Sequence, residues 1–119
     1  MSRPLSPEEL FRLHPKVRWA AFSVDGKVMF SQMRPGAASY TSDEEDRAFM
    51  QFGPLIMSGV AERLTQTGGA SKLHNVLVNL DKDSVLLMKF RNGHLALSVD
   101  RNDAFGVFQE IDVKLRELE

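Results

Sequence analysis

The sequence predicts an α+β fold, in which helices flank a sheet of short strands joined by tight turns. Segments with apolar residues at every second position, typical of half-buried strands, alternate with segments whose apolar residues recur every three or four positions, as on a helix face. The pairs Asp25-Gly26 and Asn92-Gly93 are both typical of two-residue hairpin turns. The predicted order is helix, two strands, long helix, three strands, helix.

The first part of the chain predicts a short helix and a hairpin. Ser6 can cap a helix whose first position is Pro7, because proline suits the first turn and serine accepts a hydrogen bond there. Strands are expected over 17–24 and 27–33. Residues 34–41 are rich in small and turn-forming types and predict a loop.

A long helix is expected over 43–66, with Ser42 as its cap and acidic residues in its first turn, where the helix dipole favours negative charge. Gly53-Pro54 interrupts this pattern. Proline inside a helix removes one hydrogen bond, so we expect a kink or a division of the helix, with a bend near Phe52.

The second half predicts three strands and a closing helix. The strands are expected over 72–80, 85–90 and 95–99, with 81–84 as a turn whose aspartates are turn formers. The closing helix carries one apolar stripe, which must pack on another part of the protein. Its residues are Phe108, Ile111, Leu115 and Leu118.

Composition limits the classes of partner and compartment. The chain has 119 residues, enough for one domain over 1–119, and its 15 basic and 16 acidic residues leave it nearly neutral. A nearly neutral chain lacks the positive field that non-specific nucleic-acid binding requires, so no nucleic acid is expected as a partner. No apolar run reaches the length of a membrane span or a signal peptide, and cysteine is absent. These features predict a cytoplasmic protein without membrane insertion.

The sequence offers no clear catalytic, cofactor or metal site. His14, His74 and His94 are dispersed and do not show the close spacing of metal ligands. The acidic residues at 43–46 are explained by the start of the helix. We therefore expect no catalytic residues, no cofactor and no metal, and a protein that is not an enzyme.

The order of elements resembles that of the roadblock/LC7 family, a relative of the longin and profilin-like folds. The resemblance runs from the helix at Ser6 to Leu118, and its best local match is the segment 93–106 followed by the closing helix. It implies a single roadblock/LC7-like domain with a five-stranded antiparallel sheet in the order 2-1-5-4-3, flanked by helices.

In that sheet order the strand over 72–80 lies at an edge. It has no proline and only one lysine, so it is poorly protected against pairing with another chain. The resemblance implies dimers formed through this strand and the long helix, which join two sheets into one. The expected interface residues are Leu73, Asn75, Val76, Leu77 and Val78 on the strand, and Phe52, Met57, Val60 and Ala61 on the helix.

The apolar arc of the long helix is wider than one buried face requires. We expect Ile56 to lie against the sheet, so that an aspartate there unfolds the protein. Met57 and Ala61 are expected to face a partner, so that glutamate at either position weakens association without unfolding.

Two functions remain open. The first is a non-enzymatic dimeric adaptor or regulatory subunit, which the resemblance implies would bind a Ras-like small GTPase, another complex subunit or a second roadblock-like protein as homodimer or hetero-oligomer. The alternative is a profilin-like or PAS-like sensor that holds a small ligand between sheet and helices. Such a cavity needs several polar groups. The inward faces are expected to offer only Ser23, Ser31 and Ser98, which favours the adaptor.

Overall fold

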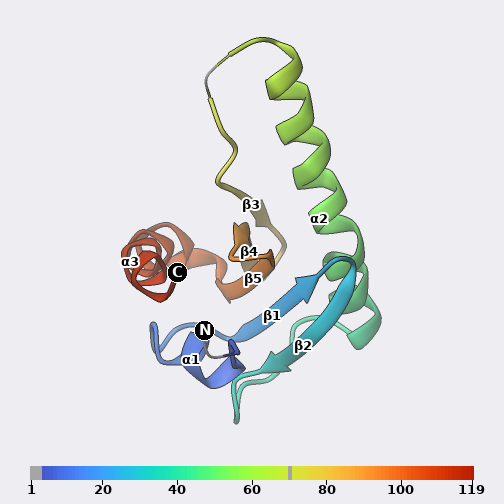
Figure 1. The fold of residues 1–119 in the computed structure, drawn as a ribbon. Helices are drawn as coiled ribbons and strands as arrows, with labels where there is room; N and C mark the ends of the chain where they lie inside the picture. The colour runs from blue at the N-terminus through green and yellow to red at the C-terminus, as the bar shows by residue number, and fades with distance from the viewer. Residues whose placement is uncertain (1–3, 70) are drawn as a thin grey trace.

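The computed structural model describes residues 4–69 and 71–119, which form a five-stranded antiparallel sheet with helices on both faces (Figure 1). The strands lie in the order β2-β1-β5-β4-β3, so the expected fold class and sheet order are confirmed. The elements are α1 (Pro7–Phe11), β1 (Trp19–Val24), β2 (Lys27–Met33), α2 (Asp43–Gln66), β3 (Asn75–Asn79), β4 (Asp83–Phe90), β5 (Gly93–Asp100), the 3-10 turn Arg101–Asp103 and α3 (Ala104–Leu118).

The sheet is the middle one of three layers (Figure 1). α1 and α3 cover one face through the larger core cluster, in which Leu97 of β5 and Ile111 of α3 are fully buried. α2 covers the other face through a smaller cluster that joins Met50 and Met57 to Leu87 of β4. The candidate site lies on this second, less completely covered face.

The helix starts form as the sequence predicts. The Ser6 side chain accepts a hydrogen bond from the backbone of Glu9, and Ser42 and Glu45 form a complete capping box. Pro54 lies inside α2 but does not divide it, because α2 is one continuous helix from Asp43 to Gln66. Buried methionines on both sides of the proline pack on the sheet and hold the two halves together.

The two predicted hairpin turns differ. Asp25 and Gly26 both have positive φ angles, 50° and 79°, as a type I′ turn requires. At the second hairpin Gly93 pairs with Phe90, so the turn residues are Arg91 and Asn92, and the prediction of an Asn92-Gly93 turn is wrong. Gly93 is required by close packing instead, because a Cβ atom there would lie 2.1 Å from the Ser23 carbonyl oxygen.

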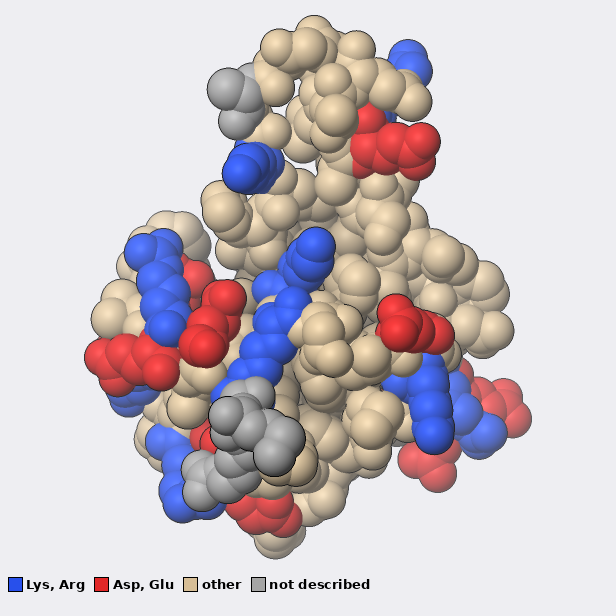
Figure 2. Space-filling model, in the orientation of Figure 1, with Lys and Arg blue, Asp and Glu red and all other residues tan. Residues whose placement is uncertain are grey.

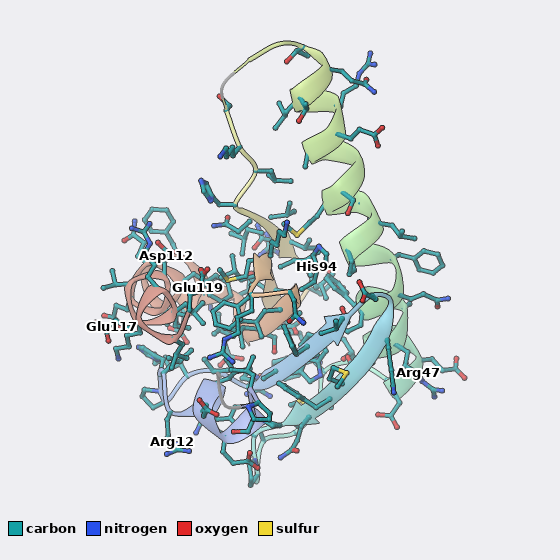
Figure 3. The ribbon with its side chains drawn as sticks, in the orientation of Figure 1. Arg12, Arg47, His94, Asp112, Glu117 and Glu119 are labelled. Carbon is teal, nitrogen blue, oxygen red and sulfur yellow. The ribbon has the colours of Figure 1, made fainter. Side chains whose placement is uncertain are left out.

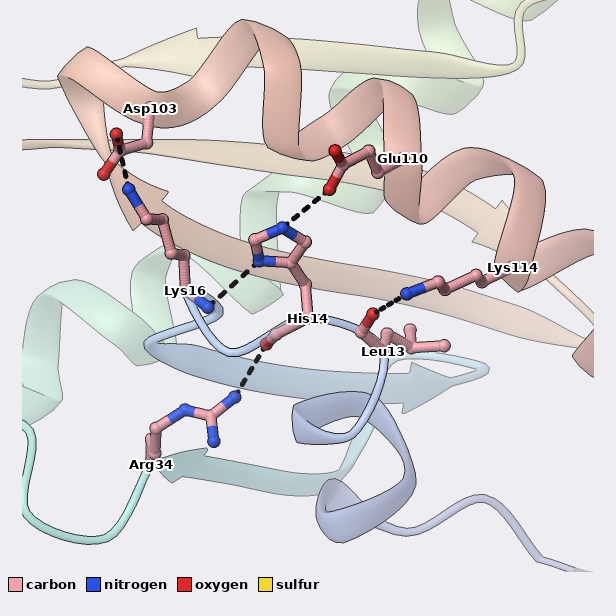
Figure 4. A network of polar contacts seen from close by, with 7 residues as sticks. All are labelled: Leu13, His14, Lys16, Arg34, Asp103, Glu110 and Lys114. Atoms are coloured by element: carbon pink, nitrogen blue, oxygen red, sulfur yellow. Dashed lines mark hydrogen bonds and ion pairs between the residues drawn. The ribbon is translucent and has the colours of Figure 1, made fainter.

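Polar contacts hold the segment between α1 and β1 against α3 (Figure 4). Lys114 donates to the Leu13 carbonyl at 2.8 Å, and Nε2 of His14 lies 2.7 Å from a Glu110 carboxylate oxygen. Arg34, at the end of the hairpin, donates to the His14 carbonyl at 2.8 Å. These contacts satisfy backbone carbonyls that lie outside any helix or strand. They hold the segment between α1 and β1 in place on the face of the sheet that α1 and α3 cover.

Candidate functional site

β3 is an edge strand with an uninterrupted ladder to β4. Its five residues pair in strict register, from Asn75 with Met88 to Asn79 with Ser84, without a bulge. The strand contains no charge and no proline, and within the described residues no other strand pairs with its outer side. Its outer backbone groups are therefore available to a strand from another chain.

α2 presents a row of exposed apolar side chains beside this edge. Phe52 is 54% exposed and Ile56 is 60% exposed, and Leu55 and Val60 are also exposed. Large apolar residues that gather on one exposed face usually mark an interaction site. Figure 2 shows that the middle of α2 carries no charged side chains in this view, whereas blue and red residues are interspersed elsewhere on the same face.

The inward face of α2 is not the one that was expected. Met57 is only 3% exposed and contacts the subunit's own sheet, whereas Ile56 faces outward, so the expected assignment of these two residues is wrong. Gly53 allows the helix to approach the sheet closely on this side. A Cβ atom at Gly53 would lie 2.7 Å from a methyl group of Leu87, so a larger residue would require the Leu87 side chain to move, and Met50 and Met57, which share the face of Gly53, pack against the sheet.

The other expected interface residues remain accessible in the subunit to different degrees. Those on the exposed side are Asn75, Leu77, Phe52 and Val60, and those partly buried are Leu73, Val76, Val78 and Ala61. Val76 and Val78 point to the α2 face of the sheet, since they pair with Leu87 and Val85 of the smaller core. Leu77 points to the opposite face.

An apolar groove separates the exposed row of α2 from β3. It has a volume of about 440 Å³, and Phe52 and Ile56 line one wall while Val76 and Val78 line the other. The structure thus brings together residues of the helix and the strand that were predicted as separate parts of one interface. Met57 is excluded from this groove.

One end of the groove carries three carboxyl groups, those of Glu45, Asp46 and Asp83, which sequence reasoning did not assign to a site. Asp83 is only 7% exposed, and burial raises its pKa, with smaller raising effects from Asp46 and Asp100. Burial also raises the pKa of Asp46, which accepts a hydrogen bond from Thr41 at 2.6 Å. Asp83 follows the alternation of Val85 on β4, and that alternation was the available signal for its inward position.

The loop between β2 and α2 closes the same end of the groove. Tyr40 donates a hydrogen bond to Asp100 at 2.9 Å, and this bond is the largest cause that raises the pKa of Tyr40. The Arg18 guanidinium lies 4.1 Å from the centre of the Tyr40 ring and 3.7 Å from Asp100, and it donates to the Ala38 carbonyl. Arg18 is thereby committed to the loop and to Asp100.

The three histidines occupy separate positions. His14 accepts a hydrogen bond from the Lys16 backbone on Nδ1, which leaves Nε2 to donate to Glu110. His94 lies on β5, where burial and Lys89 lower its pKa. His74 is exposed before β3. Within residues 4–69 and 71–119, no group of three or more potential ligand side chains is placed to hold a metal ion.

Comparison with known proteins supports the fold. No family model matches the sequence, and no curated protein matches it. Among solved structures, gliding protein MglB from Thermus thermophilus superposes with a TM-score of 0.69 at 13% identity, covering 93% of this chain and 80% of that chain. A roadblock/LC7 domain from Streptomyces avermitilis has a TM-score of 0.66 at 16% identity, covering 93% of this chain and 89% of that chain.

A third structure, described as MglB with a tetrameric arrangement, has a TM-score of 0.63 at 14% identity and covers 91% of this chain and 77% of that chain. The chain therefore has the fold of the roadblock/LC7 domains, as the resemblance in its sequence implied.

In the part of the chain that the structure describes, no helix is both long and apolar enough to cross a membrane.

Proposed function

We propose that residues 1–119 form one roadblock/LC7-type domain that acts as a non-enzymatic dimeric adaptor or regulatory subunit in the cytoplasm. Two copies pair through their β3 edges, and the exposed row of α2 in each copy packs against the other copy. The observation that carries this proposal is the coincidence of a regular, uncharged strand edge with an exposed apolar helix face beside it.

Two features of the surface support a second copy as the occupant. The β3 backbone can extend an antiparallel ladder, which requires only another strand of similar length. Phe52 and Ile56, which are exposed in a single subunit, become buried in such a dimer. Burying apolar side chains stabilises association. One solved structure with a similar fold is described as MglB with a tetrameric arrangement. We propose that this chain also self-associates.

Sedimentation equilibrium of the purified chain over a concentration series tests the dimer. The expected result is a dimer at micromolar concentration. Ile56→Asp should shift the equilibrium to the monomer while circular dichroism shows an unchanged fold. A wild-type chain that remains monomeric at high micromolar concentration would contradict the proposal.

The adaptor role requires a further partner, which we propose to be a Ras-like small GTPase or a subunit of a larger complex. This role is tested by capturing binding proteins on the purified chain from an extract of the protein's own cells. The extract is first supplied with either GDP or a non-hydrolysable GTP analogue. Retention of a Ras-like GTPase in one nucleotide state supports GTPase binding. Retention of no such GTPase in either state removes that part of the proposal.

A small-ligand sensor is the second candidate, because the groove volume of about 440 Å³ lies in the range of ligand pockets and three carboxyl groups line it. The outer wall of the groove, however, consists of the exposed residues Phe52 and Ile56. A wall of this kind favours completion by a second chain. A ligand that co-purifies with the monomeric Ile56→Asp variant would favour the sensor.

A further inference from the structure

The proposed dimer fixes the relative direction of the two α2 helices. If two β3 edges pair in antiparallel fashion and the two sheets continue with α2 on the same face, the two-fold axis is perpendicular to the sheet. Rotation about that axis reverses every direction within the plane. The two α2 helices must then run antiparallel, with the start of each helix near the end of the other.

The exposed flank of α2 ends in opposite charges. Arg63 follows Glu45 by 18 residues, which is about five turns of an α-helix, so the two side chains lie on the same flank. Phe52 and Ile56 lie on that flank between them, within a small rotation of the same line. The flank is therefore acidic at one end, apolar in the middle and basic at the other end.

Within residues 4–69 and 71–119, these charges have no partner of opposite charge. Glu45 accepts hydrogen bonds from the backbone and hydroxyl of Ser42, and Arg63 donates to the Gln66 amide oxygen at 3.1 Å. Among the described residues, neither Glu45 nor Asp46 forms an ion pair with a lysine or arginine, and Arg63 forms none with a carboxylate. Glu45 and Asp46 both line the end of the groove.

We propose that Arg63 of each copy pairs with Glu45 and Asp46 of the other copy, at both ends of the antiparallel α2 pair. This inference rests on the proposed dimer. When two such helices cross near Pro54, which lies midway between Phe52 and Ile56, residue 63 of one lies opposite residue 45 of the other. The two equivalent pairs would set the register of the helices. They would also disfavour parallel packing of the helices, because parallel packing would place the acidic ends of both helices together and the basic ends together.

Arg47 provides a matched control on the same helix. It follows Glu45 by two residues and lies on the opposite side of α2, and its side chain points away from the molecule (Figure 3). Like Arg63 it is exposed. Reversal of either charge changes the net charge of the chain equally, but only Arg63 lies on the proposed flank.

The test compares dimer dissociation constants by sedimentation equilibrium at low salt. Arg63→Glu should raise the constant about tenfold, because two exposed pairs are lost and replaced by repulsion, whereas Arg47→Glu should leave it unchanged. The double variant Glu45→Lys/Arg63→Glu should restore affinity relative to Arg63→Glu. Circular dichroism verifies that each variant is folded.

The outcomes separate this inference from the proposed dimer. A wild-type dimer whose constant is unchanged in Arg63→Glu, or is raised equally by Arg47→Glu, overturns the charge pairing and leaves the dimer in place. Because Glu45 also caps α2, the neutral cycle of Glu45→Gln and Arg63→Gln gives a second measurement. Additive effects in that cycle overturn the pairing as well. A wild-type chain that never dimerises overturns both proposals.

Discussion

The two edges of the sheet differ in how they are protected. β2 has a register shift, since Phe22 pairs with Phe30 while Ser23 pairs with Val28, and Met29 is left as an extra residue. β3 has no such shift and pairs with β4 residue for residue. A bulge twists an edge strand and prevents a regular ladder from continuing to another chain.

The two edge strands also differ in charge. β2 begins with Lys27, whereas β3 contains no charged residue, and β3 lines the groove under α2 with Val76 and Val78 while β2 contributes its last residue, Met33. Both edges expose apolar side chains, so exposure by itself does not distinguish them. Backbone regularity, together with a neighbouring apolar surface, therefore distinguishes β3 from β2 as the edge at which we propose that a partner binds.

The largest effect is expected at the helix that borders the β3 edge. Met57→Asp should unfold the subunit, because an unpaired carboxylate would replace a buried side chain, at a cost of about 3 kcal/mol or more. Ile56→Asp should leave the melting temperature of the monomer nearly unchanged. Thermal denaturation at low protein concentration measures both. Equal destabilisation by the two variants would show that α2 has a different rotation from the one described.

The next effect compares the edges directly. Leu77→Lys on β3 should raise the dimer dissociation constant about tenfold or more, because a charge would be buried where two strands meet. Met29→Lys on β2 should not change it. These residues are matched, being 42% and 55% exposed and apolar. Light scattering across a dilution series gives the constants, and a loss of association in Met29→Lys instead would assign the interface to β2.

A smaller effect should come from Asp83, at the end of the groove beside β3. Burial raises its pKa in the folded state, so the stability that it contributes is present below its unfolded pKa and is lost as pH rises through the folded pKa. Asp83→Asn should therefore raise the melting temperature at pH 7, and this gain should shrink as the pH falls toward 4. A gain that is constant with pH would exclude titration of Asp83 as its cause.

The smallest effect should come from His94, which pairs with Ser23 of β1 on the side of the sheet nearer β2. Burial, with a smaller effect of Lys89, lowers its pKa, so the stability that it contributes is present above the unfolded pKa of about 6.5 and is lost as pH falls through the lower pKa of the folded state. His94→Gln should flatten the decline in melting temperature between pH 7 and pH 5. The slope should therefore be opposite in sign to that of Asp83, and a slope identical to wild type would contradict the assignment.

Local structure follows from residues that are close together in the sequence. The caps at Ser6 and Ser42, the Asp25-Gly26 turn and the bounds of α2 depend on residues within a few positions of each other, and all of them appear as predicted. The resemblance also implied the sheet order, and that order is confirmed. Local hydrogen bonds and backbone preferences depend on neighbouring residues, so they can be predicted from the sequence.

The flank of α2 that faces the sheet is set by tertiary packing, because both flanks are apolar and the periodicity of the sequence gives the spacing of the apolar residues without giving the rotation of the helix. The observed rotation brings Gly53 close to Leu87, and the two residues are far apart in the chain. The same reason applies to Gly93, which is required by the Ser23 carbonyl, and to the burial of Asp83 at the groove. Each depends on atoms that folding brings close, so no local pattern contains it.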